Sequence, residues 1–103
     1  MSTSEESARP VCVIVIARAR DGQRNEILAA FKRSKSQIEQ IDGCLQFDVH
    51  YGVGDQKSVL VYEKWQSIEL HREAFNRITS DESFAAFRGN LEADLHLTYY
   101  HEV

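Results

Sequence analysis

This sequence of 103 residues has no long apolar stretch, and that absence argues against a membrane-spanning helix. The longest apolar run, from Val11 to Ala17, has seven residues, whereas a spanning helix needs about 18. Residues 1–10 are polar and lack the basic start and apolar core of a signal peptide. We therefore expect a cytoplasmic protein in which residues 1–10 form a flexible tail before one domain over residues 11–103.

The sequence also lacks an excess of positive charge. It has 12 Lys and Arg residues against 16 Asp and Glu residues, interspersed along the chain, for a formal net charge of −4. A nucleic-acid-binding domain usually carries a basic stripe, and an anionic membrane surface attracts basic segments. Neither nucleic acid nor a membrane is therefore expected as a partner.

Cysteine is scarce as well. Cys12 and Cys44 form neither a CxxC pair nor a spacing typical of metal ligands, so no metal site is predicted. Both lie at apolar, strand-like positions, where a free thiol behaves as a small buried hydrophobic group. We expect two buried free thiols.

What the sequence does contain is a succession of strand-like and helical patterns. Residues 11–20 are apolar on both faces, which is typical of a strand covered on both sides. A helical stripe over residues 23–41 ends at Asp42-Gly43. Two alternating segments, 44–51 and 57–65, are expected strands, with Val59, Val61, Glu63 and Trp65 on one face of the second.

The remaining segments complete the pattern. Ser67 is a candidate N-cap for a helix reaching about Ile78, and Ser80 is a candidate N-cap for a further helix. A final alternating strand is expected over residues 95–103. The side chains expected to face inward from the two helices are Leu70, Ala74, Phe75, Ile78, Phe84, Phe87 and Leu91.

The order βαββα(α)β predicts an α+β, ferredoxin-like domain with a four-stranded antiparallel sheet. Its helices can cover only one face of the sheet, yet residues 11–17 call for two covered faces. A second copy of the chain is the simplest cover, so we expect a homodimer with its sheets packed together, a dimeric α+β barrel. In the usual strand order the third strand lies between the first and second, which places Cys12 and Cys44 about 9–10 Å apart. That separation exceeds the ~7 Å limit for a disulfide.

The chain resembles the antibiotic biosynthesis monooxygenase (ABM) family, small dimeric proteins of this fold. The resemblance covers nearly the whole chain from Val11 onward. It rests most on residues 61–65, Val-Tyr-Glu-Lys-Trp, which match the Tyr-Glu-x-Trp that closes the third strand in the family. The other matching segments are Ala17-Arg18, Asp21-Gly22, Asp42-Gly43-Cys44-Leu45 and Ser80-Asp81-Glu82-Ser83-Phe84.

The resemblance implies a ligand cavity in each protomer between sheet and helices, and oxygenation of a phenolic or quinol substrate without metal or flavin. Some family histidines are replaced here, by Ala74 and Ser83. The haem-degrading branch uses an asparagine and a histidine at positions that hold Ala17 and Phe87, neither of which can ligate iron. Haem degradation is therefore not expected, and no cofactor is predicted.

The candidate catalytic residues are His50, His71 and Glu63. An unperturbed imidazole suits a general base near neutral pH, which makes His50 the first choice and His71 the second. The alternative for His50 is a position facing solvent or the partner subunit, and for His71 an exposed position on its helix. Glu63 either takes part in the site or pairs with Arg18 or Arg20.

The candidate substrate-binding residues surround Trp65, which we expect to border an apolar cavity. Phe84 and Phe87 are expected near its wall, Tyr62 as a phenolic donor, and Arg88 as a group that holds an anionic substrate. Packing in the sheet and a solvated helix face are the alternatives for Tyr62 and Arg88.

Two functions remain open from the sequence. The first is a cofactor-independent monooxygenase that acts on a small aromatic quinol or phenol. The second is a non-catalytic dimeric module that binds a small hydrophobic ligand. Polar groups that converge beside Trp65 would favour the enzyme.

Overall fold

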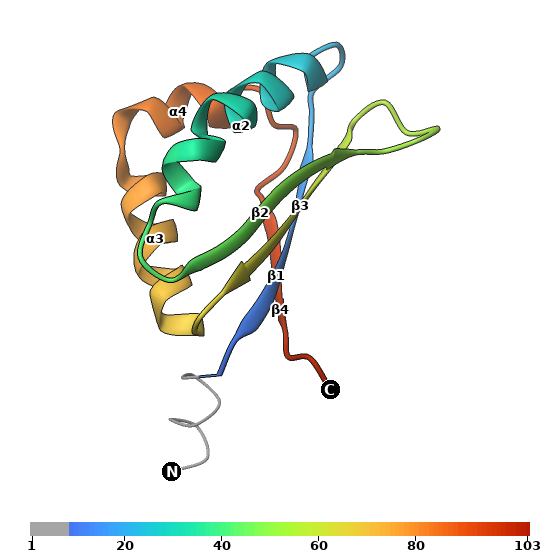
Figure 1. The fold of residues 1–103 in the computed structure, drawn as a ribbon. Coiled ribbons are helices and arrows are strands. Elements are labelled where there is room, and N and C mark those ends of the chain that lie inside the picture. Colours follow the sequence, from blue (N-terminus) through green and yellow to red (C-terminus); the bar gives the residue numbers. More distant parts are fainter. Residues whose placement is uncertain (1–8) are drawn as a thin grey trace.

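In the computed structural model, which describes residues 9–103, one sheet is covered on one face by three helices (Figure 1). The predicted elements all occur in the predicted order, with boundaries that differ by a few residues. The elements are β1 (Val11–Arg18), α2 (Arg24–Glu39), β2 (Cys44–Tyr51), β3 (Ser58–Trp65), α3 (Ile68–Ser80), α4 (Glu82–Arg88) and β4 (His96–Tyr100).

The expected α+β, ferredoxin-like fold is confirmed by this order and by the sheet. All neighbouring strands are antiparallel, in the order β2-β3-β1-β4. The most apolar strand, β1, occupies an inner position, as a strand without a polar face should. Because β3 separates β1 from β2, Cys12 and Cys44 lie on strands that are not neighbours. Both are free thiols, as predicted, but each is half-buried and not buried as expected.

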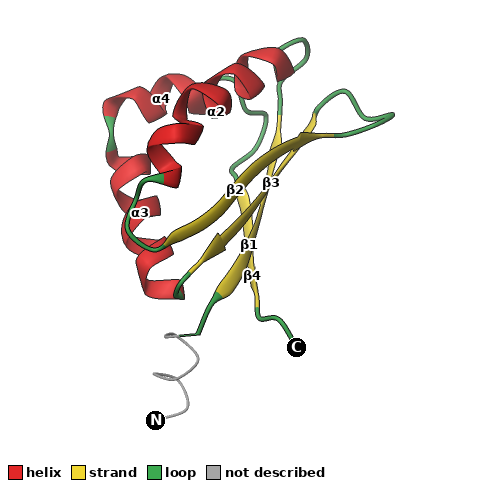
Figure 2. Ribbon diagram, viewed as in Figure 1, coloured by secondary structure: helices red, strands yellow, loops and turns green. Residues whose placement is uncertain are grey.

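The helices all lie against the same face of the sheet (Figure 2). Alternation sends every second residue of β1 and β3 into this layer, where the side chains are buried. These residues form the floor of the core: Val11, Val13, Val15, Ala17, Val59, Val61, Glu63 and Trp65. The opposite face, which we call the open face, carries no other element of the described chain.

Local signals explain where the helices begin. The Ser67 hydroxyl accepts a hydrogen bond from the Leu70 backbone N–H at 3.2 Å, so it caps α3 as predicted. The cap of α4 is Asp81 rather than Ser80, because the Asp81 carboxylate accepts from the Ser83 N–H at 2.9 Å. Gly43 joins α2 to β2 with a φ of 95°, and a Cβ there would lie 2.7 Å from the Leu70 side chain.

One strand departs from simple alternation. The pairing of β2 with β3 shifts register between Cys44 and Gln46, so Leu45 is the extra residue of a β-bulge. As a result Cys44 packs against the core and Leu45 is exposed, the reverse of what uninterrupted alternation through Phe47 predicts. From Gln46 onward the predicted alternation holds.

The predicted tail over residues 1–10 lies outside the described residues except for Arg9 and Pro10. Among the helices of residues 9–103, none is both long and apolar enough to cross a membrane.

Candidate functional site

Among residues 9–103, one carboxylate is buried in the apolar layer between the sheet and α3. Glu63 is on β3, where its neighbours across the sheet are Val13 of β1 and Phe47 of β2. Only 6% of its surface is exposed. A carboxylate in such surroundings is costly unless it is hydrogen-bonded or protonated, so its partners decide what it can do.

The first partner of Glu63 is Trp65, two residues further along β3 and therefore on the same face. The indole Nε1–H donates to Oε1 of Glu63 at 2.8 Å, and Trp65 is 1% exposed. The predicted ion pair of Glu63 with an arginine is not formed. Arg18 pairs instead with Asp55 and Glu92 at 3.0 and 3.1 Å.

The second neighbour of Glu63 is His71 of α3, which is 2% exposed. Its Nε2 lies 3.8 Å from Oε1 of Glu63, beyond direct hydrogen-bond distance. Its Nδ1 is 2.8 Å from the hydroxyl of Tyr99 on β4. Glu63, Trp65 and His71, which are buried, and Tyr99, which is half-buried, thus form one polar cluster, which we call the Glu63 cluster.

Aromatic rings hold the imidazole of His71 in place. Phe75 stacks on it with a centroid distance of 5.7 Å, while Trp65 and Tyr99 meet it edge-on at 5.4 and 5.3 Å. Together with the α3 backbone these contacts restrict rotation of the ring. The ring lies directly against Trp65, where the sequence predicted the border of an apolar cavity.

Burial moves both titrating groups of the Glu63 cluster toward their neutral forms. It raises the pKa of Glu63 to about 7, against a smaller opposing effect of the Trp65 hydrogen bond. Burial, helped by the positive charge of Arg72, lowers the pKa of His71 to about 4. At neutral pH the imidazole is therefore uncharged and the carboxyl group is close to half ionised, so it can both accept and release a proton.

The structure brings together only part of the predicted site. Glu63, His71 and Trp65 are in contact range, but His50 and Tyr62 point to the open face, because both alternate out of the layer that holds Glu63. The hydroxyl of Tyr62 lies 3.3 Å from Sγ of Cys12 there. A base on the open face cannot reach a ligand held beside Trp65.

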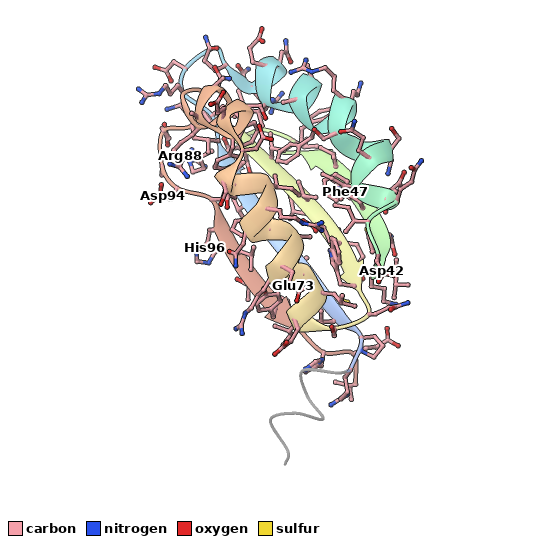
Figure 3. The ribbon with its side chains drawn as sticks, turned by 90° about the vertical axis from the view of Figure 1, so that its left-hand side faces the viewer. Asp42, Phe47, Glu73, Arg88, Asp94 and His96 are labelled. Carbon is pink, nitrogen blue, oxygen red and sulfur yellow. The ribbon has the colours of Figure 1, made fainter. Side chains whose placement is uncertain are left out.

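The three candidates on α4 lie in another part of the helix layer. Phe87 packs edge-on against Phe31, 5.2 Å between centroids, in a core cluster separate from that of Trp65. Phe84 is 5.4 Å from Phe87, and the Arg88 guanidinium covers the Phe84 ring at 5.0 Å. Figure 3 shows Arg88 far from Phe47, the strand neighbour of Glu63.

An open groove runs along α3 on the side of the α2–β2 connection, where Figure 3 labels Asp42 and Glu73. Its floor includes Leu70, which also packs against the core cluster that contains Trp65. One of the residues that line the groove, Leu70, thus directly precedes His71 in the sequence. Its lining residues are Asp42, Leu70, Glu73, Asn76, Arg77, Ser80 and Asp81.

The burial of His71 and its hydrogen bond with Tyr99 were not predicted, although the sequence marked Tyr99 as a possible phenol donor. Residues 71, 74, 75 and 78 share one face of a helix, so His71 belongs to the same inward stripe as Ala74 and Phe75. Tyr99 follows Leu95 and Leu97 on the apolar face of β4. Both signals were present in the spacing. Within residues 9–103 no cluster of His, Cys, Asp and Glu has the arrangement of a metal site.

Comparison with known proteins supports the same fold and a family. No curated protein matches the chain. A structure from Nitrosomonas europaea, named for the antibiotic biosynthesis monooxygenases, has a TM-score of 0.76 and 13% identity, covering 93% of this chain and 92% of that one. A structure from Chloroflexus aurantiacus, named for the same family, has a TM-score of 0.71 and 24% identity, with coverages of 91% and 95%.

A third structure, Rv0793 from Mycobacterium tuberculosis, has a TM-score of 0.69 and 18% identity over 91% of this chain and 95% of that one. At such identities these likenesses establish the fold. The family is established by sequence, because residues 10–90 match the profile described as antibiotic biosynthesis monooxygenase. That match spans most of the 103 residues, and the chain belongs to the antibiotic biosynthesis monooxygenase family.

Proposed function

We propose that this protein is a cofactor-independent monooxygenase that oxidises a small phenol or quinol with dioxygen. The observation that carries the proposal is Glu63, a buried carboxyl group without a cationic partner whose pKa of about 7 suits proton transfer at neutral pH. Family membership supports the reaction type. The class of substrate follows from the chemistry that such a base makes possible.

Dioxygen is a triplet and reacts slowly with closed-shell molecules, but an electron-rich phenolate can transfer one electron to it. In the proposed reaction Glu63 takes the hydroxyl proton, and the phenoxyl radical and superoxide then couple at a ring carbon that carries hydrogen. Loss of that hydrogen as a proton breaks the O–O bond and leaves a carbonyl. The departing oxygen becomes water with the two substrate protons, so phenol and O₂ give quinone and water, and the substrate supplies all four electrons.

Glu63, Trp65 and His71 each have a role in this scheme. Trp65 donates to Oε1 of Glu63, which leaves Oε2 as the oxygen that accepts the proton. His71, uncharged at neutral pH, adds no competing positive charge. The apolar rings around the cluster exclude water, which strengthens the electrostatic effect of each remaining dipole. We propose that the substrate enters from the groove that Leu70 lines, since Leu70 also packs against the core cluster that contains Trp65.

Oxygen uptake with a dihydroxynaphthalene quinol tests the proposed function. We expect uptake faster than spontaneous oxidation, in the presence of a chelator and without added flavin, with one quinone formed for each O₂ and no accumulation of hydrogen peroxide. Peroxide formed in equal amount with quinone would contradict oxygen insertion, and uptake at the protein-free rate would contradict catalysis of this substrate class.

A non-catalytic binding module is the second candidate, and the closed packing around Trp65 favours it. Trp65 is 1% exposed and His71 rests directly on it, so a ligand must displace side chains to reach Glu63. The only tryptophan of the chain reports such an event directly. Saturable quenching of its fluorescence by the quinol, without oxygen uptake, would support binding over catalysis.

We also propose that the open face of the sheet forms a homodimer interface. On this face, Ile14 of β1 lies beside Tyr62 of β3, and Ile16 of β1 lies beside Leu60 of β3. Cys12, two residues before Ile14 on β1, belongs to the same apolar centre. Polar residues border the apolar centre on the outer strands, with His50 on β2 and Asp48 beside it. An uncovered apolar sheet face of this kind fits a second copy of itself, through a two-fold axis.

Replacement of Ile16 by Asp is expected to convert a dimer into a monomer at micromolar concentration, because an unpaired carboxylate would be buried at the interface. Sedimentation velocity measures the change. Val53→Asp, at a position 97% exposed in the β2–β3 connection, is the matched control and should leave the dimer intact. A stable monomer for the unmodified protein would refute this interface.

A further inference from the structure

Tyr99 is the one member of the Glu63 cluster to which the proposed chemistry assigns no task. It lies on β4 opposite Val13 of β1, and alternation directs it into the helix layer. Its hydroxyl is 2.8 Å from Nδ1 of His71, while Nε2 of the same ring faces Oε1 of Glu63 at 3.8 Å. The two nitrogens therefore have different fixed neighbours, a phenol on one side and a carboxyl group on the other.

Hydrogen-bond accounting decides which nitrogen carries the proton. The Tyr99 hydroxyl has one hydrogen to donate, and among the described residues Nδ1 of His71 is the acceptor within reach. The other group close to Tyr99 is Arg72, whose guanidinium lies over the ring, 5.7 Å from its centroid, and can only donate. If Nδ1 carried a proton, the hydroxyl hydrogen of Tyr99 would have no acceptor in this cluster.

The Glu63 side of the ring leads to the same assignment. With Nδ1 as acceptor, the neutral imidazole carries its hydrogen on Nε2, which points toward an oxygen of Glu63. With the opposite tautomer, a lone pair of Nε2 would face the lone pairs of the ionised carboxylate. The three rings packed on His71 also oppose a flip that would exchange the two sides.

We propose that Tyr99 is a positioning residue that fixes His71 in the Nε2–H tautomer, so that His71 directs an N–H toward Glu63 and donates it to the substrate oxygen instead of acting as the base. The role in turnover rests on the proposed function, whereas the tautomer is a property of the protein alone. Trp65 then holds Oε1 of Glu63 by a hydrogen bond, and Tyr99 keeps the Nε2–H of His71 directed toward the same oxygen, which leaves Oε2 free for the substrate proton.

Nitrogen-15 NMR of the histidine side chains tests the tautomer without any substrate. The chain has four histidines, and His71→Gln identifies the signals of His71 by their loss. At pH 7 we expect a protonated Nε2 and an unprotonated Nδ1 in the unmodified protein, and a mixture of tautomers in Tyr99→Phe. Tyr100→Phe removes a hydroxyl from the opposite face of β4 and should leave the His71 signals unchanged. A protonated Nδ1, or signals that Tyr99→Phe does not alter, would overturn the assignment.

Steady-state kinetics tests the positioning role separately. We expect Tyr99→Phe to lower kcat for quinol oxidation by about tenfold or more with little change in KM, because a misplaced tautomer weakens the transition state more than binding. An equal kcat in the two proteins, with the tautomer altered as expected, would refute the role in turnover. Absence of turnover in the unmodified protein would refute the proposed function and leave the tautomer assignment standing.

Discussion

Glu63→Gln is expected to lower the turnover of a phenolic substrate by about 10²- to 10⁴-fold, the usual contribution of a general base. The amide is nearly the same size as the carboxyl group, and its oxygen can still accept the Trp65 hydrogen bond. What it loses is the capacity to take a proton. The expected loss is therefore in kcat and in kcat/KM together, without a comparable loss of substrate binding.

The pH dependence of kcat/KM in the unmodified enzyme is an independent test of Glu63 as the base. Because the pKa of Glu63 is about 7, kcat/KM is expected to rise with pH up to about 7 and then level off as the carboxylate becomes fully ionised. His71 is neutral throughout this range, since its pKa is about 4. A profile that rises around the ordinary glutamate pKa would contradict the assignment of Glu63 as the base.

Glu69→Gln is the matched control for Glu63→Gln. Glu69 is an exposed carboxylate in the first turn of α3, two residues from His71, so the control makes the same chemical change on the solvent side of the cluster. Turnover in this control should stay within about twofold of the unmodified protein. Full activity in Glu63→Gln would transfer the role of base to another group.

Sequence patterns located the parts of the site that depend on one element alone. Alternation along β3 correctly placed Glu63 and Trp65 on one inward face, because a strand reverses its side chains at every residue. The same rule placed His50 on the opposite face of its strand from Phe47, and the register of β2 with β3 then keeps it out of the Glu63 cluster. Periodicity within a strand needs no knowledge of the rest of the fold.

The parts that depend on how elements dock were harder to predict. The inward stripe of α4 was expected near Trp65, but helical spacing says which side of a helix faces the sheet and not where along the sheet the helix lies. Phe87 accordingly packs against Phe31 in the second core cluster. The hydrogen bond between His71 and Tyr99 joins residues 28 positions apart, and it depends on how α3 docks against the sheet.

Two single variants, Glu63→Gln and His71→Gln, should differ in stability from the unmodified protein by amounts that change with pH in opposite directions. In the folded state burial raises the pKa of Glu63 from 4.5 to about 7, which corresponds to about 3 kcal/mol. Between these values the unfolded chain has lost the proton that the folded protein keeps, so Glu63 makes the free energy of unfolding fall as pH rises from 4.5 to 7. Without it, Glu63→Gln should gain stability relative to the unmodified protein across this window, by about 3 kcal/mol in total.

His71 acts with the opposite sign. Its folded pKa is lowered from 6.5 to about 4, so below pH 6.5 the unfolded chain binds a proton that the folded protein refuses. The stability associated with the neutral imidazole is lost as pH falls from 6.5 to 4, and His71→Gln should therefore gain relative stability toward acid, again by about 3 kcal/mol. Urea unfolding from pH 4 to 8, at one protein concentration, measures both differences.

The two contributions largely offset each other between pH 4.5 and 6.5 in the unmodified protein, so its own stability profile conceals them. Comparison of each variant with the unmodified protein removes the titration of all shared groups and leaves the single group that was replaced. Plotted against pH, the stability difference between each variant and the unmodified protein should have a slope of opposite sign in the two variants. A stability difference that does not change with pH would mean that Glu63 and His71 titrate in the folded protein as they do in water. A buried base at Glu63 would then have no physical support.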